Sequence, residues 1–139
     1  IEILHHSEYI DRLISEKKLD ISGTGLRYAY HDPCELGRGC GIYEEPRNVV
    51  SAAGVLVEGA KKGKESICCG GSLGSLTLSD EQRKRLAENA LGNLTADSPD
   101  AVVTACPLCK NTFNRYAAVP VLDIAEIVAQ ASGRNNIKQ

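Results

Sequence analysis

The sequence predicts an α/β domain with a mainly parallel sheet flanked by helices. Short apolar runs such as residues 101–105 alternate along the chain with amphipathic stretches such as residues 79–94. Strands that alternate with helices in this way are typical of an α/β fold. The length of 139 residues and the hydrophobic content of 42% are sufficient for one domain with its own core. We therefore expect residues 1–139 to form a single domain, with residues 1–20 as a leading helix.

In the first half of the chain we expect two helices and two strands. The first helix has apolar residues at helical spacing and is expected to start near Ser7, whereas the second starts with acidic residues and a proline and stops at Gly54. Tyr and apolar residues mark the strands, and clustered glycines indicate a loop. The predicted elements are a helix over residues 3–18, a strand over 26–31, a loop over 32–41, a helix over 44–53 and a strand over 55–59.

The second half contains the clearest helix signals. Ser79 is followed three residues later by Gln82, and Asp123 is followed in the same way by Glu126, so that both pairs fit a capping box. Gly133 is the stop signal of the last helix. The predicted elements are a helix over residues 79–94, a buried strand over 101–105, a second buried strand over 119–124 and a final helix from Asp123 through Ala131.

The adjacent pair Cys68 and Cys69 is difficult to explain by packing. Neighbouring side chains diverge on a strand and do not stack on a helix, and a disulfide between them would be strained. Four of the six cysteines occur in the clusters "CC" and "CPLC", and no signal peptide is visible. This spacing favours metal ligation or redox chemistry in a reducing compartment over a scaffold of disulfides.

Five cysteines follow segments that we expect to be strands. Residues 26–31 lead to the first of them, the segment "ESI" precedes the adjacent pair, and residues 101–105 lead into "CPLC". Because the carboxyl ends of parallel strands share one edge of a sheet, where ligands bind, these sulfurs should meet there. The candidate ligands are Cys34, Cys68, Cys69, Cys106 and Cys109.

The surroundings of these cysteines favour thiolate. Cys106 is placed to cap a helix whose first residue is Pro107, and the positive end of a helix stabilises a thiolate. Gly70 and Gly71 would permit close backbone approach and could donate N–H groups to sulfur. A single zinc ion would find two adjacent cysteines difficult to use, whereas a polynuclear cluster offers a different metal atom to each.

These motifs resemble the cysteine-rich CCG domain family. The segments "YHDPCELGRGCGIYEEPRNVV", "ICCGGSLG" and "VVTACPLCKNTF" are similar to its signature segments. The family includes the cysteine-rich component of heterodisulfide reductase, the iron–sulfur components of glycolate oxidase and anaerobic glycerol-3-phosphate dehydrogenase, and lactate-utilisation proteins. The resemblance implies an iron–sulfur cluster, of the four-iron 4Fe-4S type or its noncubane form, held by the five candidate cysteines.

The resemblance also implies a function and partners. We expect electron transfer, or two-electron reduction of a substrate such as a disulfide, by a cytoplasmic domain or subunit rather than by a complete enzyme. The sequence contains one copy of the motif and no ferredoxin-type "CxxCxxC" run. This favours a C-terminal domain excised from a larger oxidoreductase, with flavin or a ferredoxin-type module on a separate domain or subunit. Membrane association would occur only through partner subunits.

Two other functions are also compatible with the sequence. The first is a zinc-binding structural or docking module without redox activity, since some family copies are thought to hold zinc. The second is a thiol–disulfide exchange domain based on "CPLC", which would leave "CC" unexplained. A net charge of −2 and no long apolar run disfavour nucleic-acid binding and direct membrane insertion.

Residues outside the five-cysteine pattern have simpler interpretations. Cys40 is expected to be a bystander in the Gly-rich loop. His31 is expected to bond to backbone at a strand end, with a position next to the cluster as the alternative. Arg38 and Arg47 are expected to be solvated, the alternative being that they offset the charge of an anionic cluster. The pair His5 and His6 is placed on a helix surface.

Overall fold

The computed structural model describes residues 1–133 and confirms the α/β class. One sheet contains four strands in the order β2–β1–β3–β4, and all three neighbouring pairs are parallel. The buried residues of the two central strands are those expected of a parallel sheet covered on both faces. The strands are β1 (Arg27–His31), β2 (Val55–Val57), β3 (Ala101–Thr104) and β4 (Val121–Asp123).

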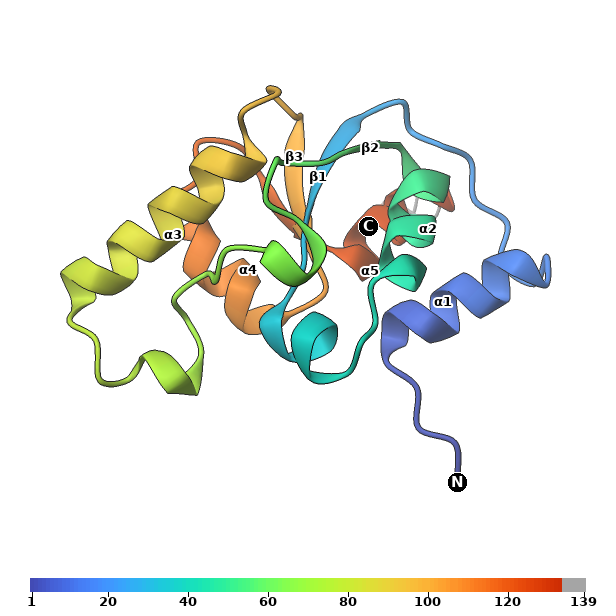
Figure 1. The fold of residues 1–139 in the computed structure, drawn as a ribbon. Coiled ribbons are helices and arrows are strands. Elements are labelled where there is room, and N and C mark those ends of the chain that lie inside the picture. Colours follow the sequence, from blue (N-terminus) through green and yellow to red (C-terminus); the bar gives the residue numbers. More distant parts are fainter. Residues whose placement is uncertain (134–139) are drawn as a thin grey trace, which may run out of the picture.

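Helices cover both faces of the sheet, as Figure 1 shows. On one face, α2 (Glu44–Ala53) and α5 (Ile124–Ala131) pack against Tyr28 and Tyr30 of β1, with α1 (His6–Ser15) outside α2. On the other face, α3 (Asp80–Leu94) and α4 (Pro107–Asn114) pack against Ala29. The alternation follows from the two-residue period of a strand. Within residues 1–133, no helix has the length and apolar character needed to cross a bilayer.

The predicted helix starts of the second half are confirmed. The side chain of Ser79 accepts the N–H of Gln82, whose own side chain accepts the N–H of Ser79, at the start of α3. Asp123 and Glu126 form the second predicted capping box at the start of α5. The four first-turn N–H groups of a helix lack intrahelical partners, so these side chains satisfy part of that requirement.

The first helix starts at His6, close to the expected start near Ser7, but is shorter than the predicted range of 3–18, and the surface prediction was wrong for His5. His5 is the N-cap of α1: its Nδ1 accepts the N–H of Ser7, and its own N–H bonds to Glu8. The helix ends before Lys17, which has a positive φ of 57°. His6 lies 3.7 Å from Asp123. The His5 ring therefore takes part in capping, whereas the His6 side chain is 39% exposed in the first turn of α1, as expected for a helix surface.

The prediction of a plain loop over residues 32–41 was also wrong. Residues Glu35–Gly39 form one turn of π-helix, in which the N–H of Cys40 donates to the carbonyl of Glu35. Gly37 lies so close to the ring of Tyr43 that a Cβ there would be 2.7 Å from a ring carbon. Glycine, normally a loop signal, is used here for close packing. Two further short helices, both of 3₁₀ type, span Gly63–Glu65 and Leu73–Ser75.

The strand order reverses between β1 and β3. The chain leaves β1 for β2 on one side and then returns to β3 on the other side of β1. The segments that follow β1 and β3 therefore move apart at the carboxyl edge and open a crevice, where ligands of parallel α/β sheets bind. Cys34 follows β1 and Cys106 follows β3, so the first and fourth candidate cysteines lie at this switch point.

Candidate metal centre

Cysteines from three separate segments line one small cavity at the carboxyl edge of the sheet. Its walls include four of the five candidates, together with Pro33, Glu35, Ser72 and Leu108. The fifth, Cys68, is next to Cys69 in the chain. All six cysteines are unbridged; Cys69 and Cys109 are buried, and only Cys40 is fully exposed. The cysteines on the cavity wall are Cys34, Cys69, Cys106 and Cys109.

The segment before the adjacent pair is not a strand, so the prediction for "ESI" was wrong. Residues 66–69 belong to no helix or strand and are tied to the end of β1 by hydrogen bonds instead. The Ser66 hydroxyl donates to the Asp32 carbonyl at 3.2 Å, and His31 Nε2 lies 3.0 Å from the Ile67 carbonyl. The His31 side chain and the Asp32 carbonyl, both at the end of β1, thus position the two cysteines without extending the sheet.

The two glycines after the pair act on the sulfurs as the sequence suggested. The Gly70 N–H donates to Cys68 Sγ and the Gly71 N–H to Cys69 Sγ, each at 3.4 Å. Gly70 has a positive φ of 79°, which a glycine adopts without strain. Hydrogen bonds to a charged acceptor favour the charged form. The backbone of this turn therefore stabilises thiolate at both positions.

The same glycines allow the cysteine turn to lie close to both α3 and α4. A Cβ at Gly70 would lie 2.9 Å from the Arg83 carbonyl of α3. At Gly71, a Cβ would overlap Thr112 Oγ1 and lie 3.3 Å from Thr112 Cβ on α4. Such distances leave no room for a side chain. The absence of side chains at both positions lets the adjacent cysteines approach the start of α4.

Gly71→Ala is expected to lower the free energy of unfolding by about 1–3 kcal/mol, the typical cost of overpacking. Gly92→Ala is the control, because a Cβ at Gly92 in α3 meets nothing within 4 Å; it should raise stability by roughly 0.5–1 kcal/mol. Urea unfolding measures both changes. Adding Thr112→Ala to Gly71→Ala should recover part of the loss. Equal effects of the two glycine substitutions would contradict the close approach.

The start of α4 is the second source of thiolate stabilisation. Cys106 is the N-cap residue and Pro107 the first helical residue, as predicted. Hydrogen bonding from the Cys109 thiol, with help from the backbone N–H groups of Leu108 and Cys109, lowers the pKa of Cys106 to about 6 against the opposing effect of burial. A cysteine at a helix start commonly behaves in this way.

The buried thiols also influence one another. Hydrogen bonds from Cys109 and then Cys68 lower the pKa of Cys69 well below its ordinary value. The same contacts raise the pKa of their partners: Cys109 through Cys106 and Cys69, and Cys68 through Cys69. One thiolate thus raises the cost of forming the next, as in any coupled set of acids. The pKa of Cys69 is therefore linked to those of Cys68 and Cys109, and the pKa of Cys109 to that of Cys106.

His31 behaves as a buried, backbone-bonded residue, which was the simpler interpretation. Its side chain is 2% exposed, and burial lowers its pKa, so the ring is neutral. A carbonyl only accepts, so Nε2 carries the hydrogen donated to Ile67. The ring meets Phe113 of α4 edge to face, with centroids 4.8 Å apart. His31 thereby joins β1, the cysteine turn and α4.

The sequence did not identify a buried ion pair beneath the site. Arg47 binds both carboxylate oxygens of Asp32, at 2.7 and 2.8 Å, and also Glu58 at 2.6 Å. Asp32 is only 3% exposed and accepts the Gly63 N–H at 2.7 Å. Arg47 is thus not solvated, contrary to expectation. No sequence motif links residues 32 and 47; only the fold brings them together.

Arg38 is exposed, as expected for a surface arginine, and its guanidinium also donates to the Ser66 carbonyl at 2.9 Å. Arg38 belongs to the π-helical turn and therefore connects this turn to the segment before Cys68. Cys40, at the end of that turn, is exposed and does not line the sulfur cavity. Within residues 1–133, no three His, Cys, Asp or Glu side chains already form a site for a single metal ion.

With this geometry in view, the comparisons with known proteins identify the family. A model described as "Cysteine-rich domain" (CCG) matches residues 28–114. The chain belongs to the cysteine-rich domain family. The matched range contains all five candidate cysteines, from Cys34 to Cys109. The predicted resemblance to the CCG family is confirmed.

Three relatives of this cysteine-rich domain illustrate its range. An EtfAB:quinone oxidoreductase of Syntrophomonas wolfei is 34% identical over 94% of this chain. A probable membrane-anchored ferredoxin of Chromohalobacter salexigens is 37% identical over 93%. One component of the dihydromethanophenazine:CoB–CoM heterodisulfide reductase of Methanosarcina acetivorans is 33% identical over 95%. The chain spans 20%, 20% and 34% of the length of these relatives, respectively.

Proposed function

We propose that this cysteine-rich domain holds an iron–sulfur cluster and carries electrons within a larger oxidoreductase. The observation that supports it most is the convergence of three segments, distant in sequence, on one sulfur-lined cavity at the switch point of the sheet. The relatives support the same function, since their names describe a quinone oxidoreductase, a ferredoxin and a component of a heterodisulfide reductase. The proposed ligands are Cys34, Cys68, Cys69, Cys106 and Cys109.

The donor set fits a polynuclear cluster. Thiolates are the usual ligands of iron–sulfur clusters, and here the N–H groups of Gly70 and Gly71 together with the start of α4 stabilise negative charge on sulfur. Adjacent cysteines suit a cluster with several metal atoms, so we propose a four-iron cluster, of cubane or noncubane form. When bound, it would supply a redox centre for electron transfer or for reduction of a substrate such as a disulfide.

The partner proposal follows from the relatives. Because the chain corresponds to a fraction of their length, we propose that a flavin or ferredoxin-type module lies on another domain or subunit. One relative is named as membrane-anchored, and we propose that any membrane association of this domain occurs through such partners. The domain itself would remain on the cytoplasmic side.

Anaerobic purification or reconstitution, followed by analysis of iron, sulfide and zinc, tests the proposal. We expect about four irons with matching sulfide, brown visible absorption and an EPR signal in one redox state. One tightly held zinc in a colourless protein would establish the structural module instead. A metal-free protein that exchanges disulfides through Cys106 would establish the thiol-exchange function. Either of the latter results would overturn the proposal.

A further inference from the structure

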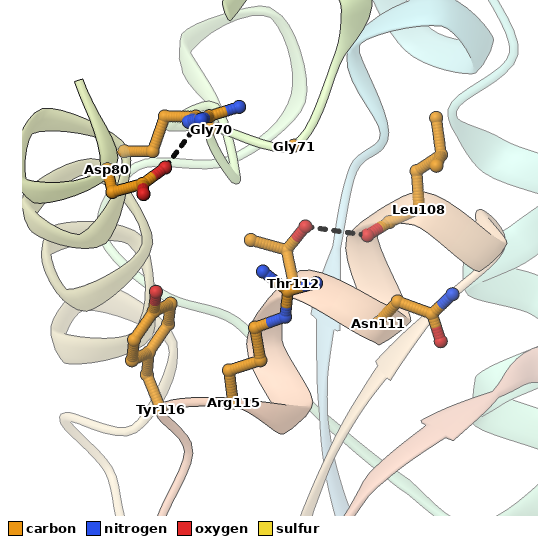
Figure 2. A pocket seen from close by; sticks show the side chains of 9 residues that line it. Gly70, Gly71, Asp80, Leu108, Asn111, Thr112, Arg115 and Tyr116 are labelled. Carbon is orange, nitrogen blue, oxygen red and sulfur yellow. Dashed lines mark hydrogen bonds and ion pairs between the residues drawn. The ribbon is translucent and has the colours of Figure 1, made fainter. Parts of the chain in front are cut away.

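A larger polar cavity lies behind the cysteine turn and is not used by the proposed cluster. It has a volume of about 440 Å³ and lies between the first half of α3 and the outer side of α4, with Gly70 and Gly71 on its wall (Figure 2). This volume falls within the range of pockets for small molecules. Its polar side chains are Asp80, Arg83, Asn111, Thr112, Arg115 and Tyr116.

The charge of this cavity is positive, although the whole chain carries −2. The cavity wall contains two guanidinium groups, those of Arg83 and Arg115, and one carboxylate, that of Asp80. Arg83 Nη2 pairs with Asp80 at 2.6 Å, but the Asp80 side chain is 96% exposed, so water screens this pair. Among residues 1–133, no carboxylate lies within ion-pair distance of Arg115. Figure 2 shows its side chain running back along α4 toward Thr112. One guanidinium therefore remains available to a ligand.

The neutral groups of the cavity add hydrogen-bond donors. The Thr112 hydroxyl donates to the Leu108 carbonyl at 2.8 Å, so its oxygen can only accept from elsewhere. The Asn111 side-chain amide and the Tyr116 hydroxyl have no hydrogen-bond partner among the described residues, and both residues line the cavity. Figure 2 shows the Tyr116 ring standing between the two helices. Arg115 and Tyr116 therefore offer donors to the cavity, whereas Figure 2 shows the Asn111 amide pointing away from them.

We propose that this cavity binds a small organic anion through a carboxylate or phosphate group. An excess of guanidinium over carboxylate and several unpaired donors match an oxyanion, which accepts hydrogen bonds in several directions and prefers arginine. The site goes beyond the proposed cluster function, because none of its polar side chains belongs to the cysteine set. Binding there should change the surroundings of the sulfurs, because Leu108 lines both cavities. The cavity wall also includes the two glycines whose N–H groups donate to Cys68 and Cys69.

The test is a titration of the isotope-labelled 139-residue chain with malonate and with inorganic phosphate, with glycerol as an uncharged control. Binding is measured from the NMR chemical shifts of the backbone amides. Malonate, phosphate or both should shift the amides of Gly71 and Thr112, and glycerol should not. Arg115→Gln should weaken binding roughly 10- to 100-fold, the effect of one charged hydrogen bond. Because Arg115 is exposed, this substitution should leave the fold intact.

Arg85→Gln is the matched control, since Arg85 lies on the same helix as Arg83, pairs with Glu81 and does not line the cavity. It removes the same charge and should leave the affinity unchanged. Which of the two anions binds identifies the preferred oxyanion. The proposal is overturned if neither anion binds, or if Arg115→Gln and Arg85→Gln weaken binding equally. All these outcomes are read without metal, so they are independent of the cluster.

Discussion

Arg47→Ala is expected to lower the free energy of unfolding by about 3–5 kcal/mol, because it leaves the Asp32 carboxylate charged, buried and without its partner. Arg47 is held on three sides, by both oxygens of Asp32, by Glu58 and by the Tyr43 carbonyl. Its guanidinium also lies 5.4 Å above the centre of the Tyr30 ring. A small domain has only about 5–15 kcal/mol of stability, so the loss should be plain in urea unfolding.

Arg85→Ala is the matched control for this substitution. It removes an arginine from an ion pair with Glu81 whose side chains are 76% and 72% exposed, and such pairs contribute about 0–1 kcal/mol. The double substitution Arg47→Met with Asp32→Asn should recover part of the loss, because no unpaired charge remains. If Arg47→Ala costs no more than Arg85→Ala, the buried pair does not support the end of β1.

The structural role of this pair extends to the cysteine turn. Asp32 accepts the Gly63 N–H through its side chain and the Ser66 hydroxyl through its backbone carbonyl. Both partners belong to the segment that delivers Cys68 and Cys69. The ion pair therefore holds the end of β1, which in turn positions two of the five sulfurs.

The sequence was sufficient to predict the parts of the fold that depend on local pattern. The buried strand at Ala101–Thr104 and the capped helix at Asp80–Leu94 are visible as an apolar run and a capping box. The meeting of Cys34 with the two cysteines of "CPLC" was also predictable, because β1 and β3 are parallel and share a carboxyl edge. These features need only residue order and the geometry of a parallel sheet.

The remaining features depend on contacts between distant residues. Asp32 and Arg47 lie 15 positions apart, and nothing in their neighbours marks them as partners. The π-helical turn contains two glycines that indicate a loop locally, whereas Gly37 packs closely against Tyr43, which the local sequence does not reveal. His5 caps a helix although histidine is not a preferred cap. The anion cavity likewise exists only because α3 and α4 lie on the same face of the sheet.

Cys69→Ser is expected to lower the iron and sulfide content at least roughly tenfold, a loss that even residues outside the ligand shell can cause. Cys69 has the most central position of the five: it is 2% exposed, lines the sulfur cavity, accepts the Gly71 N–H and contacts the thiols of Cys68 and Cys109. Serine keeps the shape of the side chain but lacks a thiolate, so the fold should persist while the site loses its central donor. Circular dichroism checks the fold, and metal analysis with visible absorption checks the site.

Cys40→Ser separates the loss of a ligand from the loss of any thiol. Cys40 is a free cysteine like the other five but is exposed and outside the sulfur cavity, so its substitution should leave iron, sulfide and absorption unchanged. Loss of the cluster in both variants would mean that the site extends to the end of the π-helical turn. Retention in both would mean that Cys69 is not a ligand, and that its low pKa reflects only hydrogen bonding within the buried thiols. Only the combination of a colourless Cys69→Ser and a brown Cys40→Ser protein supports the assignment made from the cavity wall.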